Sequence, residues 1–141
     1  VRTSLMYGFD EMDRGTAGFV RRIERGEPVV LFSDVVRNPI LVDTLAEATV
    51  LLAETPYSGT LNIAGREAVT RDEYGRRMLA YWGVATEGLV SSGSAAERSG
   101  SIPLDLRLSV VRAERMLGVD LAGLSANLSS HPHPDLRSDY A

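Results

Sequence analysis

The clearest hydrophobic pattern in the chain is the apolar run Val29–Phe32, which lies between Pro28 and the polar pair Ser33-Asp34. The run contains β-branched and aromatic residues and is too short for a helix, so it predicts a buried strand. Pro39 disfavours helical backbone at the residue before it, and residues 40–42 favour an extended segment. The polar residues between the two segments are therefore expected in a turn at a strand end, where ligand-contacting groups are often placed.

Several other segments show the apolar spacing of helices that bury one face. Thr70 and Glu73 have the form of a capping box, and Asp43 and Ser109 are the expected N-caps of two further helices. The expected helices cover residues 15–25, 43–54, 71–82 and 110–117, and glycines 26, 83 and 118 follow three of them as stop signals.

Shorter patterns predict strands over residues 1–7 and 60–64 and an edge strand over residues 102–108. Residues 91–101 are rich in Ser, Gly and Ala, so we expect a mobile loop there. The sequence of residues 129–141 is typical of a disordered tail. Together these elements predict one mixed α/β domain over residues 1–128, without the regular alternation of a complete doubly wound sheet.

Composition narrows the classes of function. The chain has 141 residues and a net charge of −4; it contains no cysteine, and all fifteen of its basic residues are arginine. The lack of lysine excludes a P-loop lysine, a Schiff-base lysine and a Tyr-x-x-x-Lys pair within this chain. Scattered basic residues argue against a nucleic-acid partner. No apolar run approaches the ~18 residues of a membrane helix, so we expect a soluble, cytoplasmic protein without a membrane partner.

Four short motifs stand in order along the chain. They are Arg-Thr-Ser-x-x-Tyr-Gly in residues 2–8, Asp-x-x-Arg-x-Pro in 34–39, Gly-x-x-Asn-x-x-Gly in 59–65 and Pro-x-x-x-Arg-Leu in 103–108. In this order and spacing they resemble the C-terminal half of an extended short-chain dehydrogenase/reductase, most closely the dTDP-4-dehydrorhamnose reductase group. Each motif alone is weak, and the combination over residues 1 to about 123 carries the resemblance.

The resemblance implies the substrate-binding part of an NAD(P)-binding Rossmann-type reductase, with NADP or NAD as cofactor and a nucleotide-linked 4-keto sugar as substrate. The family's glycine-rich cofactor turn and its catalytic Tyr/Lys pair would both precede Val1. Without them we expect the chain by itself to be catalytically inactive. Its start at Val1 suggests a piece of a longer chain or a valine-type start codon.

Arg37, Arg107 and Asp34 are the polar residues that the resemblance places against the sugar nucleotide. A planar guanidinium suits forked contacts to a diphosphate. The alternative for Arg37 is a surface pair with Asp34 or Asp43. The alternative for Arg107 is a surface role, since the apolar alternation places it on one face with Asp105.

The N-terminal segment carries the remaining candidates. Leu5 stands in the substrate site where rhamnose reductases have a Trp, which leaves the identity of the sugar open. Thr3 and Ser4 would lie beside the nicotinamide of the cofactor; the alternative is that these strand hydroxyls bond to neighbouring segments. Tyr7 is expected to be a packed aromatic residue with a solvated hydroxyl.

Two groups could suggest metal binding. Residues 10, 11 and 13 are acidic but lack the glycine-bearing loop of a calcium site, so a solvated turn is expected. His131 and His133 fall in the expected tail, where disorder is the interpretation that we favour.

Two other functions remain open. The chain could be part of an epimerase or dehydratase of the same superfamily, because the C-terminal segments separate these chemistries poorly. It could also be a non-catalytic module that binds a partner, or a second copy of itself as a homodimer, through the open edge of the strand expected at residues 1–6.

Overall fold

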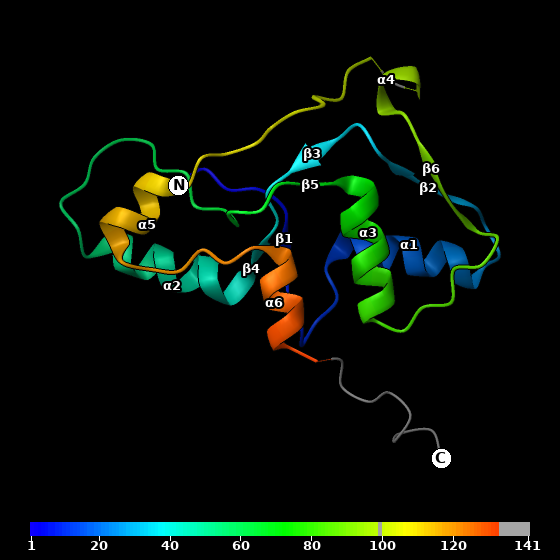
Figure 1. The fold of residues 1–141 in the computed structure, drawn as a ribbon, viewed down its shortest axis with the longest axis horizontal. Helices are drawn as coiled ribbons and strands as arrows, with labels where there is room; N and C mark the ends of the chain where they lie inside the picture. Colours follow the sequence, from blue (N-terminus) through cyan, green and yellow to red (C-terminus); the bar gives the residue numbers. More distant parts are fainter. Residues whose placement is uncertain (99, 133–141) are drawn as a thin grey trace.

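The computed structural model describes residues 1–98 and 100–132 and confirms the predicted mixed α/β class. Short strand pairs, rather than one continuous sheet, lie among the helices (Figure 1). The elements are β1 Met6–Tyr7, α1 Arg14–Glu24, β2 Val29–Phe32, β3 Val36–Arg37, β4 Ile40–Leu41, α2 Val42–Ala53, β5 Val69–Thr70, α3 Arg71–Tyr81, β6 Val90–Gly93, α4 Ala95–Arg98, α5 Val111–Leu117 and α6 Leu124–Ser130.

The strand pairs connect segments that are distant in the sequence. β1 runs parallel to β4 and β2 runs parallel to β6, whereas β3 and β5 are antiparallel. Parallel strands cannot be joined by a tight turn, so a long connection that includes helices closes each parallel pair. In Figure 1, α1 and α3 lie together beside the β2–β6 pair, and α2 and α5 pack together at the other end of the molecule.

Three groups of buried apolar side chains hold these elements together. The first lies beneath α2 and α5 and includes Leu61 and Ile63. The second joins β1, β4, α3 and α6, and the third joins α1, β2 and α3. The helix α3 contributes Met78 to the second group and Leu79 to the third, so it fixes these two parts of the fold to one another.

The helix termini follow the local signals in several places. Glu73 N donates to Thr70 Oγ1 at 3.1 Å and Thr70 N donates to Glu73 Oε2 at 2.8 Å, which confirms the predicted capping box of α3. Asp13 caps α1 by accepting from Thr16 N at 3.0 Å. Gly118 has a φ of 65°, the left-handed conformation that glycine adopts without strain, and it ends α5 as predicted.

Two of the expected N-caps are wrong. The N-cap of α2 is Leu41, so Asp43 lies in the first turn of the helix, and the N-cap of α5 is Val110 rather than Ser109. Neither Leu41 nor Val110 makes a side-chain capping bond. Packing of these two helices against the core therefore decides where they begin, and a capping side chain does not.

The extended segments also differ from expectation. Residues 60–64 and 102–108 are not strands: each makes an isolated bridge, Asn62 with Arg2 and Asp105 with Val36. Residues 91–93, expected in a loop, belong to β6, which pairs with β2, and α4 follows. Backbone pairing with a neighbour creates β6 although its side chains do not show a strand pattern.

The C-terminal helix α6 was not expected, and it contains Ser129 and Ser130. His131 follows it: its Nδ1 donates to Asn127 O at 2.9 Å, and its ring stacks on Phe9 with centroids 4.5 Å apart. The tail predicted over residues 129–141 therefore does not begin at Ser129, and residues 133–141, including His133, lie outside the described part. Among the described helices, none has the length and apolar character needed to span a membrane.

Candidate functional site

A pocket of about 510 Å³ lies where the N-terminal segment, β3 and residues 105–108 meet, and we call it the arginine pocket. Thr3, Ser4, Leu5, Arg37 and Arg107, all predicted site residues, line it together. Asp34, the remaining predicted residue, is not among the residues that line it. The other lining residues are Arg2, Asp105, Leu106 and Leu108.

One buried side chain, Asn38, holds the walls of this pocket together. It is 2% exposed. Its backbone N donates to Ser4 Oγ at 3.2 Å, and its Nδ2 donates to Gly65 O at 2.9 Å. Leu108 N donates to Asn38 Oδ1 at 2.9 Å. The polar sequence around Asn38 predicts a turn, and nothing in the neighbouring residues indicates that its side chain is buried, so this role has no signal in the sequence.

Arg37 is fixed by the segment that forms the opposite wall. Its Nη2 donates to Pro103 O at 2.8 Å, and its Nη1 donates to Val36 O at 2.7 Å and to Leu104 O at 3.2 Å. It therefore does not form the surface pair with Asp34 or Asp43 that was the alternative. Burial, and then the neighbouring Arg71, lower the pKa of Arg37, but a guanidinium stays protonated in proteins.

Arg107 forms a two-pronged ion pair with Asp105, which is the surface role that was the alternative to a ligand contact for this residue. Its Nε donates to Asp105 Oδ1 at 3.0 Å and its Nη2 donates to Oδ2 at 2.5 Å. These bonds raise the pKa of Arg107 and lower the pKa of Asp105. Both side chains remain in contact with solvent, at 64% and 48% exposure, so the pair is accessible from the pocket.

The N-terminal segment brings a further arginine and two hydroxyls. The Ser4 hydroxyl accepts from Asn38 N, which is the structural alternative for this residue, and it keeps its own proton for another acceptor. Within the described part of the chain, the side chains of Thr3 and Arg2 make no hydrogen bond. Sequence analysis did not single out Arg2 as a site residue, although its place in the Arg-Thr-Ser motif was a signal.

Asp34 serves the fold instead. Its carboxylate accepts from Ala95 N at 2.8 Å, Ala96 N at 3.1 Å and Ser94 Oγ at 2.7 Å, at the start of α4. These bonds lower the pKa of Asp34 to about 2. The substrate contact predicted for this residue is not supported by its position, because α4, which was not expected, occupies its carboxylate.

A second pocket, of about 400 Å³, borders the next part of the N-terminal segment, and we call it the acidic pocket. Its lining includes residues 6–14 and the start of α2. Asp13 accepts from Thr16 Oγ1 at 2.6 Å and from Tyr74 OH at 3.0 Å. The described residues contain no group of three side chains suited to hold a metal ion.

Tyr7 is buried, and its hydroxyl accepts from Asn127 Nδ2 at 2.8 Å rather than facing solvent.

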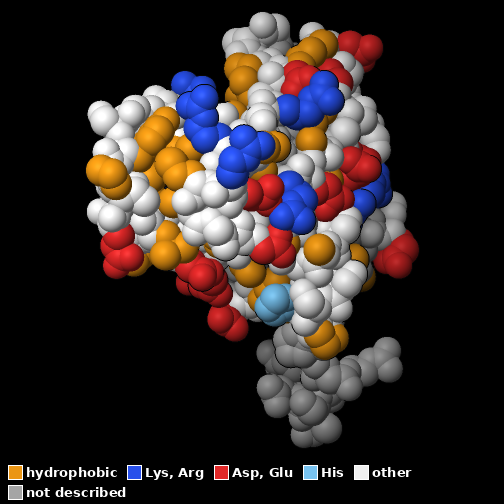
Figure 2. Space-filling view, turned by 60° about the vertical axis from the view of Figure 1, so that its left-hand side comes forward, with side chains coloured by type: hydrophobic (Ala, Val, Ile, Leu, Met, Phe, Trp, Pro, Cys, Tyr) orange, Lys and Arg blue, Asp and Glu red, His pale blue; other side chains and the backbone are white. Residues whose placement is uncertain are grey.

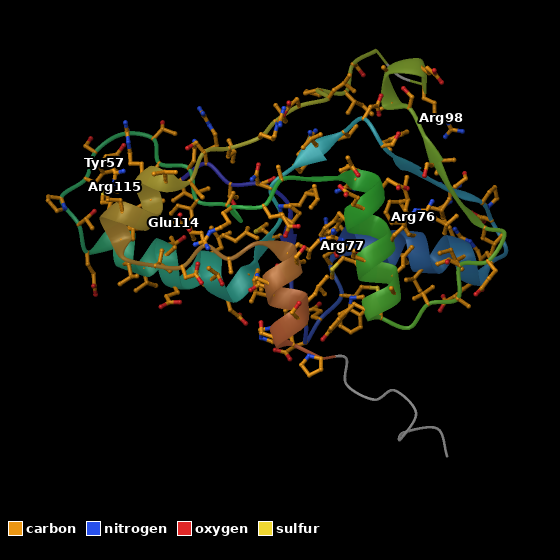
Figure 3. The ribbon with its side chains drawn as sticks, in the orientation of Figure 1. Tyr57, Arg76, Arg77, Arg98, Glu114 and Arg115 are labelled. Atoms are coloured by element: carbon orange, nitrogen blue, oxygen red, sulfur yellow. The ribbon has the colours of Figure 1, made fainter. Side chains whose placement is uncertain are left out.

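The charged side chains are unevenly spread over the surface. On the face shown in Figure 2, arginines gather in the upper and central part with acidic side chains among them, and further acidic side chains lie along the lower left border and the right edge. Figure 3 shows Arg115 and Glu114 on α5 at the left end of the view, and Arg76 on α3 to the right of the centre. Arg76 pairs with Asp72 at 3.0 Å, and it does not line the arginine pocket.

Comparisons with known proteins support the predicted resemblance, although no family model matches the sequence. The chain is 28% identical over 143 residues to the probable low-salt glycan biosynthesis reductase Agl14 of Haloferax volcanii, covering 93% of this chain and 48% of that protein. The chain thus spans about half the length of this curated relative.

Two solved structures show the same fold. The dTDP-4-dehydrorhamnose reductase of Bacillus anthracis in complex with NADP matches with a TM-score of 0.73 and 19% identity, over 90% of this chain and 44% of that one. The dTDP-glucose 4,6-dehydratase DesIV of Streptomyces venezuelae, with NAD bound, matches with a TM-score of 0.66 and 19% identity, over 92% and 40%. The chain therefore has the fold of a part of these Rossmann-type enzymes of sugar nucleotides.

Proposed function

We propose that residues 1–128 are the substrate-binding part of an NAD(P)-dependent reductase that acts on a nucleotide-linked 4-keto sugar. The observation that carries this proposal is that Arg2, Arg37 and Arg107 line one pocket of about 510 Å³. A volume of this size is typical of small-molecule sites. The two phosphates of a sugar nucleotide each carry an ionised oxygen, and forked guanidinium groups match that geometry.

For the cofactor, the described part of the chain offers the hydroxyls of Thr3 and Ser4, which line the pocket. These groups suit the carboxamide of a nicotinamide, but the printed sequence contains no glycine-rich turn for the phosphates of a dinucleotide and no lysine. When NADP or NAD is bound, it supplies the hydride. We therefore propose that this chain alone neither holds the cofactor nor reduces a sugar.

The first alternative is a dehydratase or epimerase of sugar nucleotides. The fold is shared with DesIV at the same 19% identity as with the reductase from Bacillus. The name of the Haloferax relative, which is more similar in sequence, favours the reductase. With a cofactor-binding half supplied, product analysis with dTDP-glucose and with dTDP-linked 4-keto sugars separates the two, because only a reductase consumes NADPH in proportion to the product formed.

The second alternative is a binding module without catalysis. Met6 on β1 is half exposed, and β1 pairs with β4 on one side only, so its other edge can accept a strand. Association of two copies through this edge would make the weight-average mass in sedimentation rise with concentration. A mass that stays at the monomer value over the accessible concentration range would contradict it.

The proposed function is tested by titrating the 141-residue chain with dTDP-glucose in a calorimeter, and separately with NADPH. We expect dTDP-glucose to bind and NADPH to give no measurable heat. Arg37→Ala should weaken dTDP-glucose binding about tenfold or more, since a charge-assisted hydrogen bond contributes about 1.5–3 kcal/mol. Arg76→Ala is the matched control, because it removes a partly exposed arginine outside the pocket.

Circular dichroism and thermal unfolding of both variants show whether the fold is intact, because Arg37 also bonds to residues 103 and 104. A folded Arg37→Ala variant with unchanged affinity contradicts the role of Arg37. A wild-type chain that does not bind dTDP-glucose contradicts the proposed function itself.

A further inference from the structure

The arginine pocket contains one acidic side chain among its described lining residues, Asp105, and this carboxylate already occupies Arg107. Its influence extends to Arg37, because each of the two residues shifts the pKa of the other through their opposite charges. The pocket therefore combines the positive charges of Arg2, Arg37 and Arg107 with one negative charge of its own.

The backbone holds Asp105 in this place. Val36 N donates to Leu104 O at 2.7 Å, and Leu106 N donates to Val36 O at 3.3 Å, on either side of the residue. Leu108 N is held by Asn38 Oδ1 two residues further on. Because the segment is fixed before and after Asp105, its carboxylate can rotate about its own side-chain bonds but cannot leave the pocket with a moving loop.

The ion pair itself can be opened by a ligand. Both Asp105 and Arg107 are about half exposed or more, and exposed ion pairs contribute little to stability. An incoming phosphate can therefore replace the carboxylate on Arg107. The displaced carboxylate remains within the pocket and stays ionised near neutral pH, because the ordinary pKa of an aspartate, 3.8, lies far below neutrality.

A carboxylate that is retained in this way discriminates between ligands by charge. Both phosphates of a nucleotide-linked sugar are diesters with one ionised oxygen each, whereas the terminal phosphate of a free nucleoside diphosphate carries additional negative charge near neutral pH. Repulsion by a nearby fixed charge grows with the charge on the ligand. We propose that Asp105 is a specificity-determining residue that favours the nucleotide-linked sugar over the free nucleoside diphosphate. This inference rests on the proposed function.

The experiment measures the affinities of the 141-residue chain for dTDP-glucose and for dTDP, in the wild type and in Asp105→Asn, at low ionic strength. We expect Asp105→Asn to strengthen dTDP binding more than dTDP-glucose binding, so that the preference for the sugar nucleotide falls by roughly threefold to tenfold. The change should shrink at high salt, because mobile ions screen exposed charges.

The matched control is Asp120→Asn. Asp120 also pairs with an arginine at the surface, Arg66, but it does not line the pocket, so this variant should keep the wild-type preference. An unchanged preference in Asp105→Asn would overturn the inference, and so would a loss of dTDP-glucose affinity larger than the loss for dTDP. If the wild type binds neither ligand, the proposed function fails, and the inference fails with it.

Discussion

The arginine pocket and the acidic pocket border successive parts of the same N-terminal segment, residues 2–5 and residues 6–14, yet their charged groups are used differently. In the acidic pocket, Asp13 accepts bonds from Thr16 and Tyr74, so its charge serves the fold. In the arginine pocket, the side chain of Arg2 makes no hydrogen bond to any described residue, and the pair formed by Arg107 is exposed. The charged side chains of the arginine pocket are thus held by the fold to different degrees: Arg37 donates to three backbone carbonyls, Arg107 is in an exposed ion pair, and Arg2 is left to meet a ligand.

The largest effect on stability is expected from a substitution next to Asn38, the residue that holds the walls of the arginine pocket together. In Gly65→Ala, the added methyl group would overlap the backbone carbonyl of Pro39, next to Asn38. Backbone must then move to relieve the overlap, so we expect a loss of about 3 kcal/mol in the free energy of unfolding, measured in urea. Gly100→Ala is the control, because its methyl group would meet no atom within 4 Å. Equal stability of the two variants would contradict the close packing of Gly65 against the Pro39 carbonyl.

Removing the carboxylate of Asp13, which the fold bonds in the acidic pocket, should reduce stability and leave dTDP-glucose binding unchanged. Asp13→Ala removes the cap of α1 and leaves the buried Tyr74 hydroxyl without its acceptor, so we expect a loss of about 2 kcal/mol in unfolding free energy. The affinity for dTDP-glucose should not change. Glu11→Ala, which removes an exposed acid of the same pocket, should leave both quantities near the wild-type values. A weakened affinity in a folded Asp13→Ala variant would show that the acidic pocket also serves the ligand.

Removing the side chain of Arg2 should weaken binding and spare stability. Arg2→Ala removes a cationic side chain from the arginine pocket but keeps the backbone bonds of Arg2 with Leu61 and Ile63. We expect dTDP-glucose to bind roughly threefold more weakly, because water and mobile ions screen an exposed charge. We expect the stability to be unchanged. Arg14→Ala is the matched control, because Arg14 lines the acidic pocket. Equal affinities of the two variants would mean that Arg2 does not contact the ligand.

The smallest effect concerns Asp34, which lies outside both pockets. Its pKa falls from 3.8 to about 2 on folding, so its contribution to stability is fully present above about pH 4 and is lost as the pH falls through the folded value. The difference in urea midpoint between the wild type and Asp34→Asn should therefore be largest at pH 5 and vanish toward pH 2. A difference that stays constant over this range would contradict the shift.

Local signals predicted those parts of the fold that neighbouring residues define. Thr70 and Glu73 are three residues apart, and they form the predicted capping box; the run Val29–Phe32 forms the predicted strand. The strand β6 shows the limit of this approach. Its last three residues, Ser-Ser-Gly, belong to the predicted loop, and they form a strand only because β2, far away in the sequence, pairs with their backbone.

The candidate site could be predicted as a set of residues but not as an arrangement. The motifs identified Arg37 and Arg107, but their convergence depends on Asn38, whose bonds to residues 4, 65 and 108 span the chain. Asp34 shows the opposite case. It stands two residues after a strand, which favours a ligand role, yet the start of α4 takes its carboxylate. Ser94 and Glu97 have the spacing of a capping box, and Glu97 N donates to Ser94 Oγ at 3.3 Å, so the sequence held a signal for this helix that the loop prediction over residues 91–101 overlooked.

The parallel pairing of distant strands has a consequence for the order of folding. Met6 pairs with Ile40 and Val29 pairs with Val90, so long loops must close before these contacts stabilise the chain, and such closure slows folding. The arginine pocket draws its walls from residues 2–5, 37 and 105–108, segments that are about a hundred residues apart at the extremes. Ligand binding to the arginine pocket should therefore appear after helix formation during refolding, which makes the pocket a kinetic marker for a late step of assembly.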